Sequence, residues 1–229
     1  MVKLGSIAYW ISDHSYEKYS ILNAQTESLH FDGAAGTIEA LRDVAAEPRG
    51  IAVIAHPHPL FGGTMNNKVV QTLARAFVQS GFTALRFNFR GVGSSAGVYD
   101  EGRGELADLL ALVRQAAPEG PIALAGFSFG AFVTSHALAQ LWSEREVSHA
   151  ILVGTAASRF AVAPVPPEAH GRSLVLHGES DDTVPLASVL DWARPQSLPV
   201  TVIPGVGHFF HGQLTLLKHL VVRHLQTTG

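Results

Sequence analysis

Hydrophobic and polar residues alternate in the first part of the chain that shows a regular pattern. Residues 28–32 and 37–43 alternate apolar and polar side chains on either side of Gly33-Ala-Ala-Gly36. A period of two places one face of a strand against a core and the other face against water. We therefore expect an antiparallel hairpin at the start of the fold.

Short, nearly continuous apolar runs follow the hairpin. Runs of about four to eight apolar residues are typical of strands that are buried on both faces of a parallel sheet. These runs cover residues 50–55, 82–89, 121–125, 149–155, 173–177 and 199–203.

Segments with helical spacing of apolar positions lie between these runs. Residues 66–80 are one example, with Val69, Leu73 and Phe77 on one face and Gly81 at the end. The other segments cover residues 105–117, 131–142, 185–193 and 213–225. This alternation predicts an α/β fold with a mostly parallel sheet of about seven to eight strands and helices on both faces.

The regular pattern predicts a single α/β domain over residues 27–229. Residues 1–26 mix aromatic and charged side chains in a way that matches nothing later in the chain, so we expect an N-terminal extension there. This segment lacks the apolar core of a signal peptide, and no apolar run in the chain is long enough to span a membrane. We expect a cytoplasmic protein with no membrane span.

Composition narrows the possible partners and chemistry. The net charge of the 229 residues is −3, and the basic residues are scattered, which argues against a nucleic-acid partner. The chain has no cysteine, so disulfides, thiolate metal ligands and a cysteine nucleophile are excluded. Neither the histidine pair His56 and His58 nor the glycine-rich segment 90–95 carries the further residues that a metal or phosphate site needs. We expect no cofactor and no metal ion.

The segment Gly126-Phe-Ser-Phe-Gly130 joins a predicted strand to a predicted helix. A reversal over so few residues forces a strained backbone on the central residue, and glycine on each side leaves room where the helix packs on the strand. The turn would hold the Ser128 hydroxyl above the sheet edge at a helix N-terminus. Ser128 is therefore the candidate nucleophile.

A serine nucleophile needs a base, normally a histidine that is oriented by a carboxylate. The loop after residues 173–177 contains Glu179, Asp181 and Asp182, and we favour Asp181 because Asp182 is well placed to cap the turn before Pro185. The loop after residues 199–203 contains His208 and His211, and we favour His208 because it follows the strand closely.

An acyl-transfer site also needs N–H donors for the tetrahedral oxyanion. One donor is expected to be the backbone N–H of Phe129, which follows the nucleophile at a helix N-terminus. The loop His56-Pro-His-Pro-Leu-Phe-Gly-Gly63 should supply the other, and its two prolines have no N–H. That leaves His58 and Leu60; we favour Leu60, with the His58 ring bracing the loop.

With these motifs, the chain resembles the α/β-hydrolase superfamily, and within it the small lidless bacterial hydrolases of the dienelactone-hydrolase-like branch. The resemblance spans about residues 27–226 and depends on His56-Pro-His-Pro-Leu-Phe-Gly-Gly-Thr-Met-Asn-Asn-Lys68, Asn88-Phe-Arg-Gly-Val-Gly-Ser94, Gly126-Phe-Ser-Phe-Gly130, His177-Gly-Glu-Ser-Asp181 and Gly207-His-Phe-Phe-His-Gly212.

The resemblance implies an α/β-hydrolase fold and a catalytic triad of Ser128, His208 and Asp181, with the Phe129 and Leu60 amides as oxyanion donors. The order serine, acid, histidine along the chain is the order of that fold. Only residues 156–172 are available where many α/β hydrolases insert a lid, so no lid domain is expected. Dienelactone hydrolases proper use a cysteine nucleophile, so lactone-ring substrates of that kind are not expected here.

These features predict hydrolysis of carboxylic esters with small or exposed acyl groups, through an acyl-enzyme. An open, shallow site is expected, with Phe61, Phe209 and Phe210 as candidate pocket residues. Amide, peptide or thioester cleavage by the same residues is an alternative. A third hypothesis is a catalytically silent binding protein, although the three intact triad positions argue against it.

Overall fold

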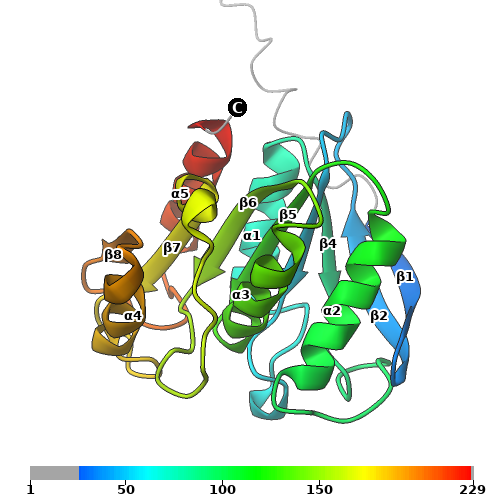
Figure 1. Cartoon of the computed structure of the whole chain (residues 1–229), viewed down its shortest axis with the longest axis horizontal. Helices are drawn as coiled ribbons and strands as arrows, with labels where there is room; N and C mark the ends of the chain where they lie inside the picture. The colour runs from blue at the N-terminus through cyan, green and yellow to red at the C-terminus, as the bar shows by residue number, and fades with distance from the viewer. Residues whose placement is uncertain (1–25, 228–229) are drawn as a thin grey trace, which may run out of the picture.

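A computed structural model of the chain describes residues 26–227, which form one eight-stranded sheet covered by helices on both faces (Figure 1). The strands are β1 (Thr26–Gly33), β2 (Gly36–Asp43), β3 (Ile51–Ala55), β4 (Thr83–Phe87), β5 (Ile122–Phe127), β6 (Val147–Val153), β7 (Ser173–Gly178) and β8 (Val200–Ile203). The α-helices are α1 (Lys68–Gln79), α2 (Arg103–Ala116), α3 (Phe129–Leu141), α4 (Leu186–Ala193) and α5 (Leu214–Thr227). Short 3₁₀ helices are η2 (Pro59–Phe61), η3 (Pro167–Arg172) and η4 (Arg194–Gln196).

The sheet confirms the expected mixed topology. Its strand order is β1-β2-β4-β3-β5-β6-β7-β8. The hairpin β1–β2 is antiparallel and β2 also pairs antiparallel with β4, whereas each pair from β4 to β8 is parallel. The carboxyl ends of the six parallel strands therefore lie along one edge of the sheet.

Each central strand is buried on both faces because its side chains alternate between two cores. In β3, Ala52 and Ile54 pack in a cluster with residues of α1 and α5, whereas Val53 and Ala55 pack in a cluster with residues of α2, α3 and α4. Figure 1 shows the same division, with α1 and α5 behind the sheet and α2 and α3 in front of it. This two-sided burial explains why the parallel strands have continuous apolar sequences.

The connection between β6 and β7 contains no lid domain. It runs from Gly154 to Arg172, and its only helix in the described structure is the short η3. The prediction of a lidless fold is therefore confirmed.

The predicted N-terminal extension, residues 1–26, lies outside the described residues except for Thr26, which begins β1. Across residues 26–227, none of the helices has the length and apolar character that a bilayer crossing requires.

Candidate active site

Ser128 occupies the sharp turn between β5 and α3. It adopts φ 58° and ψ −115°, a conformation that few residues with a side chain adopt. The turn is fixed on both sides, because the Ser128 N–H donates to the Val153 carbonyl at 2.8 Å and the Ser128 carbonyl accepts from Ala131 N–H at 3.0 Å. The strained backbone expected from the sequence is present.

The two glycines around Ser128 are required by close packing. A Cβ atom on Gly126 would lie 2.3 Å from the Gly130 carbonyl oxygen, and one on Gly130 would lie 2.3 Å from the Ala55 carbonyl oxygen. Both distances are far below normal contact, so any larger residue would push α3 away from β5 or β3. The glycines let the helix reverse directly onto the sheet.

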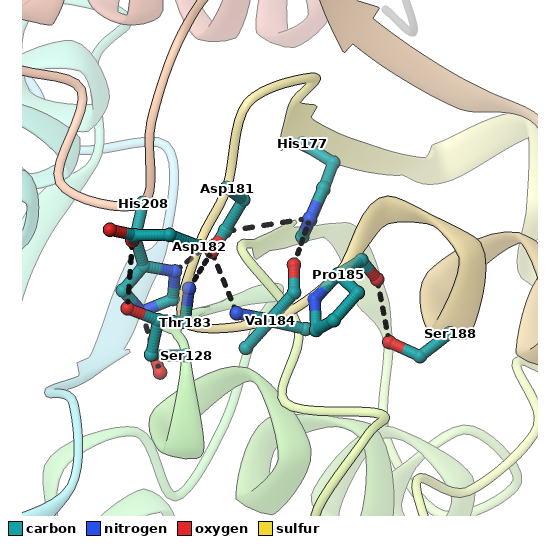
Figure 2. A network of polar contacts seen from close by, with 9 residues as sticks. All are labelled: Ser128, His177, Asp181, Asp182, Thr183, Val184, Pro185, Ser188 and His208. Atoms are coloured by element: carbon teal, nitrogen blue, oxygen red, sulfur yellow. Dashed lines mark hydrogen bonds and ion pairs between the residues drawn. The ribbon is translucent and has the colours of Figure 1, made fainter.

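The structure brings Ser128, His208 and Asp181 into one hydrogen-bonded chain, shown in Figure 2. The Nε2 atom of His208 lies 3.0 Å from Ser128 Oγ, and its Nδ1 atom lies 2.6 Å from Asp181 Oδ2. The three residues are 80 and 27 positions apart along the chain, and all three are buried. Because they follow β5, β7 and β8, the parallel sheet itself brings them to one edge.

Asp181 is held as an ionised acceptor. The Thr183 and Val184 N–H groups donate to its Oδ1 at 2.9 and 2.7 Å, which leaves Oδ2 for His208. Burial alone would raise the pKa of Asp181, but the hydrogen bonds from His208 and Val184 outweigh burial and lower it. An ionised Asp181 accepts the Nδ1–H of neutral His208, so Nε2 of that ring is free to accept the Ser128 proton.

His177, near the end of β7, is part of the same network, although its place in the motif His177-Gly-Glu-Ser-Asp181 predicted no role for its side chain. Its Nε2 lies 2.9 Å from the Val184 carbonyl and 3.4 Å from Asp181 Oδ2, so the ring packs against the acid (Figure 2). Burial lowers its pKa, so the ring is neutral and Nε2–H donates to the carbonyl. The available signal was a polar residue at a buried position of an otherwise apolar strand.

The alternative acids and base have other contacts. Glu179 accepts from Gly205 N–H at 2.9 Å, Asp182 is exposed, and His211 stacks on Phe209 with ring centroids 5.8 Å apart. The expectation that Asp182 caps the turn before Pro185 was wrong, because Asp181 accepts the turn amides itself.

The Leu60 N–H of the predicted oxyanion loop has a partner within its own loop. The Leu60 N–H donates to His58 Nδ1 at 3.2 Å, and its side chain is 67% exposed, outside the pocket that contains Ser128. This confirms that the His58 ring braces the loop, but the same bond occupies the Leu60 amide. The assignment of the second oxyanion donor to Leu60 stays a prediction, and it requires the Leu60 N–H to leave His58 when substrate binds. Phe129 is the first residue of α3, and the first N–H groups of a helix lack intrahelical partners. Its N–H is therefore available to an oxyanion, as expected from the sequence.

A pocket of about 360 Å³ opens at Ser128. Its walls are mainly aromatic and apolar, and they include the predicted residues Phe61 and Phe209. The lining residues are Pro57, His58, Phe61, Gly62, Gly63, Asn67, Ser128, Phe129, Ala156, Arg159, Phe160, Thr183, Val184, His208 and Phe209. The prediction for Phe210 was wrong: the residue has φ 54°, and its ring is fully buried in the core with residues of α1 and α5.

A second, mostly buried set of polar residues, which we call the bracing network, consists of His56 after β3, Asn88 and Arg90 after β4, and Asp108 in α2. His56 Nδ1 lies 2.6 Å from the Pro57 carbonyl and Nε2 accepts from Phe89 N–H at 2.9 Å. Arg90 donates to both oxygens of Asp108 at 2.8 and 2.9 Å, and Asn88 accepts from Met65 N–H and donates to Glu39. Burial lowers the pKa of His56 to about 4, so the ring is neutral.

Neither sequence motif of the bracing network has the geometry of a ligand site. His56 uses both ring nitrogens on the backbone, and Arg90 is paired with Asp108. Within residues 26–227, the structure brings together no group of three histidine, aspartate or glutamate side chains that could hold a metal ion.

Comparison with known proteins identifies similar chains. Residues 58–172 match the family model described as "alpha/beta hydrolase fold". The chain is 33% identical over 202 residues to an uncharacterized protein of Rickettsia prowazekii, covering 80% of this chain and 81% of that protein.

Two solved structures are similar over most of their length. XC6422 from Xanthomonas campestris, described as an α/β serine hydrolase without a lid, is 35% identical with a TM-score of 0.79, covering 89% of this chain and 94% of that chain. An α/β serine hydrolase homologue from Coxiella burnetii is 39% identical with a TM-score of 0.74, covering 87% of this chain and 97% of that chain.

Proposed function

The chain belongs to the α/β-hydrolase fold family, and on that premise we propose that it is a serine esterase in which Ser128, His208 and Asp181 form the catalytic triad. One observation carries this proposal: the continuous chain from Ser128 Oγ to His208 Nε2 at 3.0 Å and from His208 Nδ1 to Asp181 Oδ2 at 2.6 Å. These are the distances over which a histidine takes and returns a proton.

In the first half of the reaction, Ser128 Oγ attacks the carbonyl carbon of the ester while His208 Nε2 takes the hydroxyl proton. Asp181 stabilises the resulting imidazolium, and the Phe129 N–H donates to the oxyanion. The tetrahedral intermediate then collapses, the C–O bond to the alcohol breaks, and His208 returns the proton to the departing oxygen. This leaves the acyl group on Ser128.

In the second half, water attacks the acyl-enzyme and His208 takes a proton from that water. The second intermediate collapses, Ser128 regains its proton from His208, and the carboxylic acid leaves. Each half begins and ends with neutral His208 and ionised Asp181.

The pocket supports small acyl groups as substrates. Its volume of about 360 Å³ lies near the lower end of the usual range for small-molecule sites, and no lid extends it. Its aromatic walls suit an apolar acyl chain. We therefore expect faster hydrolysis of short para-nitrophenyl esters than of long-chain ones.

Ser128→Ala tests the proposal. We expect it to lower kcat/KM for para-nitrophenyl butyrate by about 10⁴-fold or more, because the nucleophile is lost while the fold remains. A fluorophosphonate probe should label the wild-type protein on Ser128 and should not label the variant. Ser158→Ala, which removes an exposed serine from a neighbouring loop, is the matched control. Unchanged esterase activity in Ser128→Ala would refute the assignment.

A further inference from the structure

Among residues 26–227, Arg159 is the only aspartate, glutamate, lysine or arginine that lines the Ser128 pocket. The other walls are aromatic, apolar or neutral polar, and Asp181 lies beneath the pocket with its side chain fully buried. The pocket that receives the substrate therefore carries one positive charge, from an arginine that is exposed at its rim.

Arg159 has no ion pair within the described part of the chain. Arg42, Arg86, Arg90, Arg103 and Arg194 each pair with a carboxylate in that part. An arginine presents a planar set of donors that matches a carboxylate, and pairing through two parallel bonds is its strongest mode. Arg159 thus offers an unused carboxylate-binding group at the edge of the pocket.

The segment that carries Arg159 is fixed. The Arg159 and Phe160 N–H groups both donate to the Ala156 carbonyl, at 3.2 and 3.1 Å. The Phe160 ring stacks on Phe132 with centroids 4.7 Å apart and contacts Phe129 at 5.2 Å. The backbone position from which the Arg159 side chain extends is therefore set by the core and not by a free loop.

Side chains of α3 and α4 hold the residues that follow Arg159. Ser135 Oγ accepts from Ala163 N–H at 3.1 Å, and His136 Nε2 lies 2.8 Å from the Ala161 carbonyl. Trp192 Nε1 donates to the Ala163 carbonyl at 3.2 Å. Together with the bonds to Ala156, these bonds hold the backbone both before and after Arg159.

The positive charge of Arg159 also acts inside the pocket. His58 is a neighbouring wall residue, and its pKa is lowered first by burial and second by the charge of Arg159. His58 is consequently neutral near pH 7, so it does not supply a second charge that would compete for an anion.

A second depression, of about 490 Å³, lies beside the first and shares His208, Phe209 and Thr183 with it. Its lining includes Asp182 and contains no arginine or lysine. His208 lines both depressions and, in the proposed mechanism, returns a proton to the departing alcohol; we assign the pocket at Ser128 to the acyl half and the second depression to the alcohol half. The two sides of the scissile bond therefore differ in charge, with a cation at the Ser128 pocket and an anion at the second depression.

We propose that the substrate is an ester whose acyl half carries a carboxylate, which pairs with Arg159, and whose alcohol half carries no negative charge. This proposal rests on the serine-esterase function above and names its substrate class. The acyl chain lies against Phe61, Phe160 and Phe209, and its far end reaches Arg159 while its ester carbonyl lies at Ser128.

A matched pair of esters tests the proposal. Mono-para-nitrophenyl adipate and para-nitrophenyl hexanoate share the acyl length and the leaving group and differ only in the terminal carboxylate. We expect the wild-type enzyme to have a higher kcat/KM for the adipate, and Arg159→Gln to lower the ratio of the two values by about tenfold, the size of one charge-assisted pairing. Arg159→Glu should invert the preference.

Arg114→Gln is the charge-matched control, because Arg114 is exposed near the end of α2, on a helix that contributes no residue to the pocket. It should leave the adipate-to-hexanoate ratio unchanged. A second ester pair places the carboxylate on the alcohol half: para-hexanoyloxybenzoate against its methyl ester. The wild-type enzyme should not prefer the charged member of that pair, and a clear preference for it would overturn the proposed polarity.

The outcomes separate the two proposals. If Ser128→Ala still hydrolyses both esters, the proposed function fails. If Ser128→Ala is inactive but Arg159→Gln keeps the wild-type ratio, the esterase assignment stands and the role of Arg159 is refuted. A wild-type enzyme that hydrolyses the hexanoate better than the adipate also refutes it.

Discussion

The bracing network after β3 and β4 and the network of Ser128, His208, Asp181 and His177 after β5, β7 and β8 are both buried at the carboxyl edge of one sheet. In the bracing network, both ring nitrogens of His56 and the Nε and Nη2 atoms of Arg90 have partners inside the chain. In the second network, which we call the reactive network, the hydrogen bonds run in one direction and reach Ser128 at the wall of a pocket. Ser128 also has the strained backbone, with φ 58°.

This difference shows that buried polar residues at an active edge do not all have the same role. A network whose groups are all paired holds loops in place, because each polar group has exchanged water for a protein partner. A network that ends at a cavity can pass a proton to a bound molecule. Both networks contain a buried histidine and a buried aspartate, and the accessible end distinguishes them.

The largest expected effect tests the reactive network. Asp181→Asn should lower kcat for para-nitrophenyl butyrate by about 10³- to 10⁴-fold, because the amide does not hold His208 with Nε2 free and does not stabilise the imidazolium. Steady-state kinetics measures the loss, and circular dichroism should show an intact fold. Asp182→Asn is the adjacent control and should lose less than about tenfold; equal losses in the two variants would contradict the choice of acid.

The next effect tests the bracing network. Asp108→Ala leaves the Arg90 guanidinium, whose side chain is only 11% exposed, without its carboxylate, and should lower the free energy of unfolding by about 2–4 kcal/mol, near the range for breaking a buried pair. Urea denaturation measures this change. Asp191→Ala removes the partner of exposed Arg194 and should lower stability far less. If Asp108→Ala is as stable as wild type but loses activity, the two networks are not functionally distinct.

The smallest effect concerns pH. The pKa of His56 is about 4 in the folded chain and about 6.5 in the unfolded chain, so between these values only the unfolded chain binds the proton. Stability should therefore fall as pH drops from 6.5 to 4, with His56 contributing about 3 kcal/mol, and this contribution should not grow further below pH 4.

Urea denaturation between pH 7 and pH 4 measures how steeply the free energy of unfolding falls with pH. The variant His56→Asn should make this slope shallower. His149, whose pKa is also lowered to about 4, keeps part of the slope in that variant. The same slope in wild type and variant would show that His56 does not titrate as its burial requires.

Much of this fold could be predicted because local pattern determines it. The strand at residues 51–55 and the helix at residues 68–79 follow directly from an apolar run and from helical spacing. Three candidate site residues could also be identified, since Ser128, Asp181 and His208 each follow a strand and parallel strands end at one edge.

The remaining site features depend on packing between distant segments. The Leu60 amide is occupied because a ring two residues earlier turns toward it, and the Phe210 ring is buried among residues of α5 and of α1, which is far away in sequence. His177 reaches Asp181 only because β7 packs in the sheet beside the other strands. Arg159 reaches the pocket only because the segment after β6 folds against α3 and α4. No periodicity along the chain records those contacts.

The close contacts of Gly126 and Gly130 with the backbone have a consequence for how this sequence can diverge. A substitution at Ser128 changes a side chain that faces the pocket, so a descendant could acquire another nucleophile, or become a binding protein, without rebuilding the turn. A substitution at either glycine would separate α3 from the sheet. Across descendants of this chain, the two glycines should therefore stay unchanged wherever the fold is kept, whereas the residue at position 128 should change when the function changes.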